Sequence, residues 1–250
     1  MPRLSAIIIA KDEARNIAEC LDSVAFCDER IVVVDGCGGD DTAAIAQGKG
    51  ARVAASPFTG FGAQKNFALS QATGDWVLSI DADERVTPAL AAEIRAAIAT
   101  PQVDAYAMSR LSSFCGRAMR HSGWWPDHVL RLFRRGGARF SDDIVHERLV
   151  CDGATARLSE PLLHFPVRKL EDALSRMDRY STAGAQMLVK SGRRVWFVSG
   201  PLHGAWTFLR TYILQLGFLD GREGFLLAIA NAQGSYYRYM KAWVAQRQKP

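Results

Sequence analysis

Three short apolar runs in the first third of the chain each lead into acidic side chains. Residues 4–10, 31–34 and 76–80 are almost continuously apolar. Continuous rather than alternating apolar residues are typical of strands covered on both faces, as in a parallel sheet. Asp35 directly follows the second run and Asp81 the third. Because ligands of such sheets bind beyond the carboxyl ends of the strands, these carboxylates are expected at a ligand-binding edge.

Helical patterns separate these runs. Apolar residues recur at helical spacing between 17 and 24, short helices are expected over 42–47 and 64–71, and an alanine-rich helix is expected from Pro88 to about residue 99. A further short strand is expected at 51–54. The alternation predicts the α/β class, with a mostly parallel, Rossmann-like sheet flanked by helices.

The composition fits one large domain, or one domain with an appendage. The chain has 250 residues, of which 48% are hydrophobic, which is enough to bury a full core. Its five cysteines form no C-x-x-C pair and are odd in number, so neither a zinc site nor a complete disulfide framework is indicated. We therefore expect the protein to be located in a reducing cytoplasm. The first residues do not resemble a secretion signal.

The positive charge is concentrated in the C-terminal third. Residues 165–250 hold 13 Lys and Arg and five Asp and Glu, a net charge of +8, whereas residues 1–164 have a net charge of −3. This asymmetry predicts an anionic surface, such as lipid headgroups, as a partner of the tail. No nucleic-acid-binding motif accompanies the charge, so we expect no nucleic-acid partner.

The sequence Asp81-Ala82-Asp83 is the candidate metal clamp. Side chains at i and i+2 of an extended segment point to the same side, so Asp81 and Asp83 are expected to grip one Mg²⁺ or Mn²⁺ and leave positions for phosphate oxygens. The alternative is a surface turn after a strand, since Asp is common in turns. Lys65 is a candidate phosphate contact, although lysine is more often solvated.

The motifs taken together resemble family 2 glycosyltransferases of GT-A fold. The resemblance rests on Lys11-Asp12-Glu13, on 31–35, on 62–66 and on 74–84. It implies a nucleotide-sugar site made of Ala10, Glu13, Asp35, Lys65, Asp81, Ala82 and Asp83. Where that family usually has Asp-Ser-Gly-Ser-Thr-Asp, residues 35–40 read Asp-Gly-Cys-Gly-Gly-Asp, so two hydroxyl groups of this loop are absent.

Residues 106–150 are rich in arginine and aromatic side chains. Tryptophan faces suit stacking on sugar rings and arginines bind phosphates, so Trp124, Trp125 and Arg131 are candidate acceptor contacts. An ordinary protein interior with solvated arginines is the alternative. Inverting sugar transfer also needs a carboxylate base for the acceptor hydroxyl, and Glu147 or Asp143 fills that role.

Further segments extend the resemblance over essentially the whole chain. Residues 110–116, 121–127, 131–135, 142–148 and 217–225 are similar to the WaaE group, β-1,4-glucosyltransferases of the lipopolysaccharide inner core. This likeness implies a UDP-hexose donor, preferentially UDP-glucose, and a heptose acceptor carried on lipid A. The GT-A resemblance also implies His164 as a third metal ligand beside Asp83, and an imidazole suits Mn²⁺ better than Mg²⁺. From the residues alone, a lone histidine after an apolar pair is usually a core residue.

The tail is predicted to be a basic, amphipathic, helical extension over 168–250, following a catalytic domain over 1–167. We divide that domain into a nucleotide-sugar half, 1–100, and an acceptor half, 101–167. His203, Arg210 and Gln215 interrupt the apolar stretch 202–219, which argues against a membrane-spanning helix and for a helix in the membrane interface. Packing of this stretch against the core or a second subunit is the alternative.

The sequence therefore predicts a metal-dependent, inverting hexosyltransferase at the cytoplasmic face of the bacterial inner membrane. An inactive module that binds a nucleotide sugar or anionic lipid is the second hypothesis, motivated by the altered loop at 35–40. A nucleotidyltransferase on a related sheet is the third. It should show a triphosphate-binding loop near the N-terminus, which Lys11-Asp12-Glu13 does not resemble.

Overall fold

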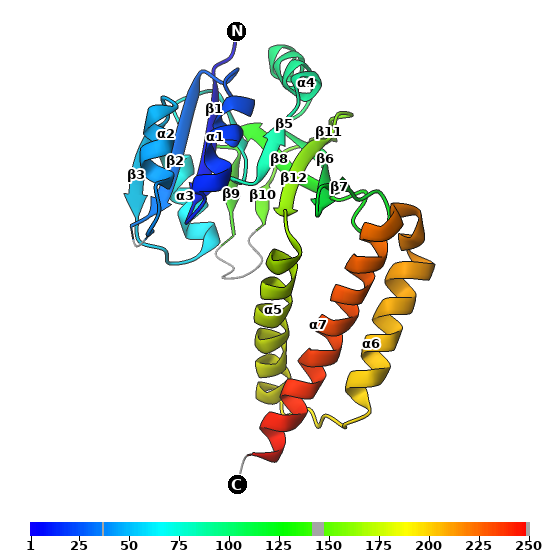
Figure 1. Ribbon diagram of the computed structural model, residues 1–250. Helices are drawn as coiled ribbons and strands as arrows, with labels where there is room; N and C mark the ends of the chain where they lie inside the picture. Colours follow the sequence, from blue (N-terminus) through cyan, green and yellow to red (C-terminus); the bar gives the residue numbers. More distant parts are fainter. Residues whose placement is uncertain (37, 142–147, 249–250) are drawn as a thin grey trace. The chain divides into compact units, whose positions relative to one another are not determined.

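The computed structural model describes residues 1–36, 38–141 and 148–248 (Figure 1). The chain forms two compact units. The sheet unit comprises Met1–Arg110 and Asp127–His164, and the helical unit comprises Leu111–Pro126 and Phe165–Pro250. Residues 111–126, which the sequence analysis assigned to the acceptor half, thus group with the C-terminal helices.

The sheet unit contains a mixed sheet with the strand order β3-β2-β1-β4-β8-β6-β12-β5. Its strands are β1 (Leu4–Ala10), β2 (Glu29–Asp35), β3 (Arg52–Ser56), β4 (Trp76–Ser79), β5 (Glu84–Val86), β6 (Ala105–Phe114), β8 (His128–Arg134) and β12 (Leu162–Val167). Strands β3, β2, β1 and β4 are parallel, and β8 runs antiparallel to both β4 and β6. The predicted α/β fold with a mostly parallel sheet is confirmed.

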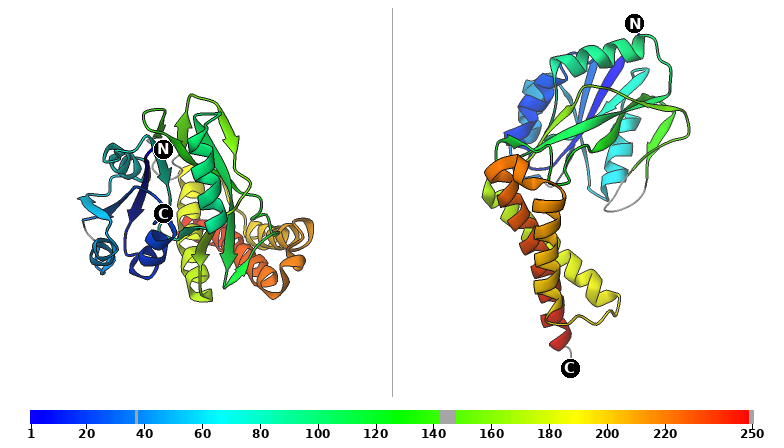
Figure 2. Two further views of the ribbon diagram at one scale, coloured as in Figure 1. Left: turned by 90° about the horizontal axis from the view of Figure 1, so that it is seen from above. Right: turned by 90° about the vertical axis from the view of Figure 1, so that its right-hand side faces the viewer.

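Both faces of the parallel strands are buried, which explains their continuous apolar sequence. On one face, Ile8 and Leu78 lie in a cluster with side chains of α1 (Ala14–Ser23) and α4 (Pro88–Ala99). On the other face, Ile7 and Val77 pack with Ala68 of α3 (Phe61–Ser70). Figure 2 shows helices on both sides of this sheet. Helix α2 (Thr42–Gly48) connects β2 to β3.

The remaining strands of the structure are short. Strand β7 (Arg117–Ala118) pairs with β6, and β11 (Thr155–Arg157) pairs with β6 in parallel. Strands β9 (Ala138–Phe140) and β10 (Leu149–Cys151) form a separate antiparallel pair. Residues 142–147, which come between β9 and β10 in the sequence, lie outside the described part of the chain.

The helical unit is built around the long helix α7 (Gly221–Arg247). Helices α5 (Leu170–Lys190) and α6 (Ser199–Leu209) both pack on α7, which lies between them (Figure 1). A π-helical turn η1 (Arg210–Leu214) and a 3₁₀ turn η2 (Gly217–Asp220) connect α6 to α7. The expected helical C-terminal extension is confirmed. Every helix among the described residues is too short or too polar to traverse a bilayer.

A buried aspartate joins two segments of the helical unit. The Asp220 carboxylate accepts hydrogen bonds from the backbone N–H groups of Arg120 and His121, each at 3.1 Å, and from the Ser122 hydroxyl at 2.9 Å. Only 2% of Asp220 is exposed. Because a buried carboxylate is costly without such donors, this network fixes residues 120–122 to the start of α7.

Candidate active site

The carboxyl ends of β1 and β2 form the donor edge of the site. Ala10, the last residue of β1, is buried and pairs with Val34 of β2. Asp35 ends β2 and is only 6% exposed, and Lys11 Nζ lies 2.7 Å from its Oδ2 atom. Glu13 precedes α1, and its backbone N–H donates to the Thr42 hydroxyl at 2.8 Å. The structure therefore brings Ala10, Glu13 and Asp35 to one edge.

The described part of the glycine-rich loop is held by two other carboxylates. Asp12 Oδ1 accepts from the Gly39 N–H at 2.9 Å, and Asp12 itself has a φ of 54°. Asp40 accepts from the backbone N–H groups of Ala14 and Thr42. Hydrogen bonding to Thr42 lowers the pKa of Asp40, although its slight burial acts in the opposite direction. The loop thus has backbone anchors in place of the hydroxyl-bearing residues expected from the family pattern.

Residues 81–84 form a turn rather than the extended segment that we expected. The Glu84 N–H donates to the Asp81 carbonyl at 2.9 Å, and the Asp81 N–H donates to the Glu84 carboxylate at 2.8 Å. These reciprocal bonds close the turn that connects β4 to β5. Ala82, between Asp81 and Asp83, is buried.

Asp81 lies between two cations. Lys65 Nζ is 3.0 Å from Asp81 Oδ1, and Arg131 contacts Asp81 Oδ2. Arg131 also lies 2.6 Å from Glu84 Oε1, and Glu84 is completely buried. Burial would raise the pKa of Asp81, but the charges of Arg131 and Lys65 outweigh it and hold the pKa well below its usual range. Asp81 is therefore a firmly ionised carboxylate.

Asp83 and His164 meet beside this turn. His164 Nε2 lies 3.4 Å from Asp83 Oδ2, and both side chains are largely buried. Strand pairing causes this approach, because His164 of β12 lies opposite Glu84 of β5 in the antiparallel register. Of the three predicted metal ligands, the structure thus brings Asp83 and His164 together and engages Asp81 with Lys65 and Arg131.

The Asp83–His164 pair fits a divalent cation whose other ligands come from a substrate and water. One carboxylate oxygen and one imidazole nitrogen are a donor set that suits Mn²⁺. Among the described residues there is no group of three or more His, Cys, Asp or Glu side chains that would hold a metal ion. A cation at this pair would therefore take its remaining ligands from substrate oxygens and water.

The predicted bases Glu147 and Asp143 lie outside the described residues, but the structure describes both ends of their segment. Ser141 and Arg148 hold these ends together: the Ser141 N–H donates to the Arg148 carbonyl at 2.9 Å, and the Arg148 N–H donates to the Ser141 hydroxyl at 3.0 Å. Asn66 also exchanges two side-chain hydrogen bonds of 2.9 Å with the backbone of Phe140. The segment therefore begins and ends at a strand pair fixed to α3, the helix that carries Lys65.

The three predicted acceptor contacts fall in different units. Arg131 belongs to the sheet unit, where it is buried against Asp81 and Glu84. Trp124 and Trp125 belong to the helical unit. Trp124 packs edge-on against Phe114, with ring centroids 6.1 Å apart, and the Arg120 guanidinium lies over the Trp125 ring. Acceptor binding by these residues stays a prediction.

Sequence reasoning did not identify the roles of Glu84, Arg110 or Asn66. Glu84 closes the turn and anchors Arg131, while Arg110 Nη1 lies 3.5 Å from the same Glu84 carboxylate. The usable signal for Glu84 was an acidic residue directly after Asp83, and Arg110 lay in the arginine-rich region 106–150. Asn66 lay in the segment 62–66 of the family resemblance, but no pattern indicated its contact with Phe140.

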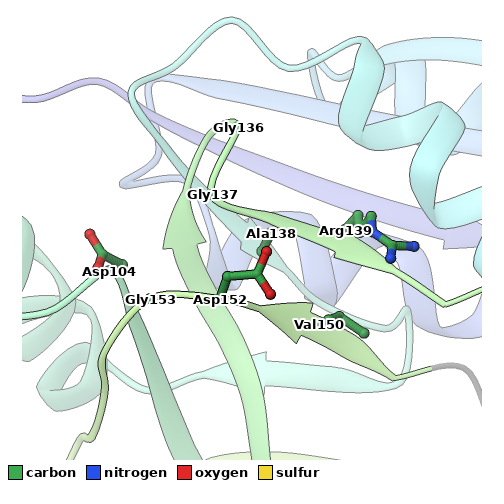
Figure 3. A pocket seen from close by; sticks show the side chains of 8 residues that line it. All are labelled: Asp104, Gly136, Gly137, Ala138, Arg139, Val150, Asp152 and Gly153. Atoms are coloured by element: carbon green, nitrogen blue, oxygen red, sulfur yellow. The ribbon is translucent and has the colours of Figure 1, made fainter.

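A cavity of about 430 Å³ lies at another edge of the sheet unit (Figure 3). Its walls include the turns 136–137 and 152–153 together with Asp104 and Arg139. The first turn follows the carboxyl end of β8, where Arg134 pairs with Trp76 at the start of β4. The cavity thus lies at the end of β4 opposite to the turn at 81–84, and none of the predicted site residues lines it.

Comparisons with known proteins identify the family of the chain. The sequence model of glycosyl transferase family 2 matches residues 5–156. The chain is 32% identical over 253 residues to the lipopolysaccharide core biosynthesis glycosyltransferase LpsC of Rhizobium meliloti, covering 96% of this chain and 90% of LpsC. It is 29% identical over 256 residues to an uncharacterized glycosyltransferase of Rickettsia felis, covering 96% of this chain and 89% of that protein.

Among solved structures, glucosyl-3-phosphoglycerate synthase from Mycobacterium tuberculosis, in complex with Mn²⁺, UDP and glucosyl-3-phosphoglycerate, is 25% identical. The likeness covers 44% of each chain with a TM-score of 0.39. The family assignment rests on the sequence comparisons, which cover more than half of the chain. The chain belongs to glycosyltransferase family 2 and is a glycosyltransferase.

Proposed function

We propose that this glycosyltransferase transfers glucose, with inversion and with the help of Mg²⁺ or Mn²⁺, from UDP-glucose to a heptose of the lipopolysaccharide inner core. The observation that carries the proposal is the Asp83–His164 pair, 3.4 Å apart, beside the ionised Asp81 at the turn after β4. Similarity to LpsC along 96% of the chain supports the lipopolysaccharide core as the acceptor class.

The donor edge would bind the uridine diphosphate. Ala10, Glu13 and Asp35 would border the nucleoside at the ends of β1 and β2, where carboxylates would accept hydrogen bonds from ribose hydroxyls or the uracil ring N–H. Lys65 supplies positive charge next to Asp81, at 3.0 Å, and this charge would favour a diphosphate nearby. Asp81 and the buried Ala82 would then border the sugar phosphate.

Asp83 and His164 would hold the divalent cation. The bound cation would offset the negative charge that grows on the departing UDP, which is a Lewis-acid contribution. Lys65 and Arg131 keep Asp81 ionised and in place, so the turn keeps one geometry before the donor arrives. Arg131 was predicted to contact the acceptor phosphate. Its pairing with Asp81 and Glu84 supports the additional role of positioning the turn.

Glu147 would take the proton from the acceptor hydroxyl, with Asp143 as the alternative base. The attachment of Phe140 to Asn66 supports this proposal, because it fixes the start of the base segment to the helix that carries Lys65. Trp124 and Trp125 would stack on the rings of the acceptor. Because the acceptor is attached to lipid A, the enzyme would work at the cytoplasmic face of the inner membrane.

Transfer to a heptose-bearing core acceptor tests the function directly. With UDP-glucose and Mn²⁺, mass spectrometry should show the acceptor gaining one hexose, and the Asp83→Ala variant should show none. Asp75→Ala is a matched control, because Asp75 lies just before β4, at the opposite end of that strand, and accepts a bond from the Arg3 N–H. Full transfer by Asp83→Ala, or none by the unmodified chain with any UDP-hexose, would contradict the proposal.

Two further comparisons separate its finer parts. Glu147→Gln should stop transfer while UDP binding stays nearly intact, whereas full turnover by this variant would move the base to Asp143. Thermal shifts with UDP-glucose, UDP-galactose and UDP-GlcNAc in Mn²⁺ should be largest for the true donor. A larger shift with UDP-galactose would replace glucose in the proposal and leave the rest unchanged.

A further inference from the structure

One face of α6 and η1 exposes a continuous row of large apolar side chains. We name Val198, Leu202, Trp206, Leu209 and Ile213 the apolar stripe. Their spacing of three or four residues places them on one side of a helix. Each is between 44% and 66% exposed. Isolated exposed apolar residues are ordinary, but a contiguous row of this kind marks an interaction surface.

The opposite side of α6 is already used for packing within the helical unit. A Cβ atom added at Gly204 would lie 3.2 Å from Tyr236 Cβ and 3.3 Å from the Ala232 carbonyl of α7. Gly200 likewise approaches Met240 of α7. These glycines allow close contact with α7 and leave the apolar stripe on the outward side of the helix. The stripe is therefore not the packing face of α6.

The apolar surface continues beyond the helix. Leu214, Leu216, Phe218 and Leu219 in the connection to α7 are each at least 45% exposed. Trp196 and Phe197, which precede α6, are more than half exposed. Two of the exposed side chains, Trp196 and Trp206, are tryptophans, which are characteristic of the boundary between lipid and water, where an apolar ring can keep its N–H hydrated.

The charges around the stripe have one sign. From residue 179 to residue 219 the sequence contains no Asp or Glu, but it contains five Lys and Arg residues. Arg193, Arg194 and Arg210 are exposed, and the Arg194 guanidinium lies 4.3 Å from the centre of the Trp196 ring. An apolar surface whose charged neighbours within this stretch of sequence are all basic is complementary to anionic headgroups above acyl chains.

We propose that the apolar stripe and its basic neighbours dock the protein on a lipid bilayer containing anionic headgroups. Helix α6 has 11 residues, so it is about 16 Å long and would lie in the plane of the interface rather than across it. A second copy of the chain is a poorer occupant, because a two-fold interface would set Arg193 and Arg194 against a surface with the same charge. This proposal depends on the proposed function in one respect only, namely that the acceptor is attached to lipid at the membrane.

Vesicle co-sedimentation of the full chain tests this proposal without any sugar. Binding to vesicles of equal parts phosphatidylglycerol and phosphatidylcholine should exceed binding to pure phosphatidylcholine and weaken in high salt. Leu202→Ser/Trp206→Ser should reduce partitioning about 100-fold, since each side chain contributes about a factor of 10 on burial. Arg193→Gln/Arg194→Gln should reduce it about 25-fold on the anionic vesicles alone, about fivefold for each charge.

The matched control is Tyr180→Ser/Met187→Ser on α5, which removes two apolar side chains of 67% exposure outside the stripe. It should bind vesicles as the unmodified chain does. Circular dichroism and elution volume verify that each variant is folded. Equal partitioning by Leu202→Ser/Trp206→Ser and the control would overturn the proposal. So would a lipid-free dimer that this double variant dissociates, because the occupant would then be a second copy.

Failure of docking is distinguishable from failure of the proposed function. In Mn²⁺, the Leu202→Ser/Trp206→Ser variant should hydrolyse UDP-glucose at the same slow rate as the unmodified chain. It should also transfer glucose to a detergent-free core oligosaccharide at the rate of the unmodified chain. It should lose transfer only to acceptor embedded in vesicles. Equal transfer to the embedded acceptor by this variant and the unmodified chain would count against docking, whatever the donor proves to be.

Discussion

Replacing Arg131 by methionine should remove the central cation of the buried charge cluster. Arg131 is 7% exposed on its side chain and bridges Asp81 and the fully buried Glu84. Breaking a buried ion pair from one side costs about 3–5 kcal/mol, because it leaves a buried charge without its partner. Two neighbours reduce this cost: Lys65 remains 3.0 Å from Asp81, and Arg110 remains 3.5 Å from Glu84.

We therefore expect Arg131→Met to lower the free energy of unfolding by about 3 kcal/mol, the lower end of that range. For a chain of this size the loss corresponds to a decrease in Tm of about 6–12 °C, measurable by circular dichroism or differential scanning fluorimetry. Adding Glu84→Gln should restore part of the loss, since the neutral amide is cheaper to bury than the carboxylate.

Arg134→Met provides the matched control on the same strand. Arg134 Nε lies 3.2 Å from Asp104 Oδ1, but both side chains are nearly half exposed, so the pair should contribute less than about 1 kcal/mol. Arg131→Met should therefore be at least twice as destabilising as the control. If both variants melt at the same temperature, the claim that a buried charge cluster fixes the turn at 81–84 is refuted.

Three other substitutions test separate parts of the structure. Folding lowers the pKa of the Asp81 carboxyl, so this group stabilises the fold above about pH 3.9, the pKa of an aspartate in the unfolded chain. This stabilisation is lost as the pH falls below that value towards the lower pKa of the folded state. Asp81→Asn should therefore flatten the acid limb of the curve of unfolding free energy against pH. Asn66→Ala removes both hydrogen bonds to the backbone of β9. It should cost about 1–3 kcal/mol in denaturant titrations and slow transfer more than it weakens UDP binding. Gly224→Ala would place a Cβ atom 1.9 Å from the Gly217 carbonyl and should destabilise by about 3 kcal/mol, whereas Gly48→Ala, which meets nothing within 4 Å, should be nearly neutral. An equal effect of the two glycine substitutions would contradict the close packing of η2 on α7.

Local sequence patterns predicted the parallel strands because their burial is visible in the chain itself. The run 4–10 forms β1 with those bounds, and the helix expected from Pro88 to residue 99 is α4. Both faces of β1 are covered, so its side chains are apolar except for Ser5, whose buried hydroxyl donates to the Glu29 carboxylate at 2.7 Å. Predictions of this kind depend only on neighbours in the sequence.

The pairing of site residues depends on contacts that local patterns do not encode. Arg131 reaches Asp81 because β8 inserts antiparallel beside β4, across 50 residues of sequence. His164 reaches Asp83 through the register of β12 on β5, and periodicity did not predict β5. The family resemblance suggested His164, whereas the residues alone indicated only a core histidine.

The C-terminal apolar stretch shows the same limit. Its sequence predicted a surface-seeking helix but did not choose between the membrane and the protein core. Gly200 and Gly204 settle which face of α6 packs on α7, and their close approach appears only when both helices are in place. The exposure of Leu202 and Trp206 then follows from the position of these glycines.

Calorimetric titration with UDP tests most directly whether Asp83 and His164 hold the cation that carries the donor. The unmodified chain should bind UDP in the presence of Mn²⁺. Its affinity for UDP should fall to a small fraction when a chelator removes the metal. Asp83→Ala and His164→Ala should each bind UDP weakly and equally under both conditions, while Asp75→Ala should behave as the unmodified chain. Equal UDP affinity of the unmodified chain with Mn²⁺ and with chelator would contradict the account.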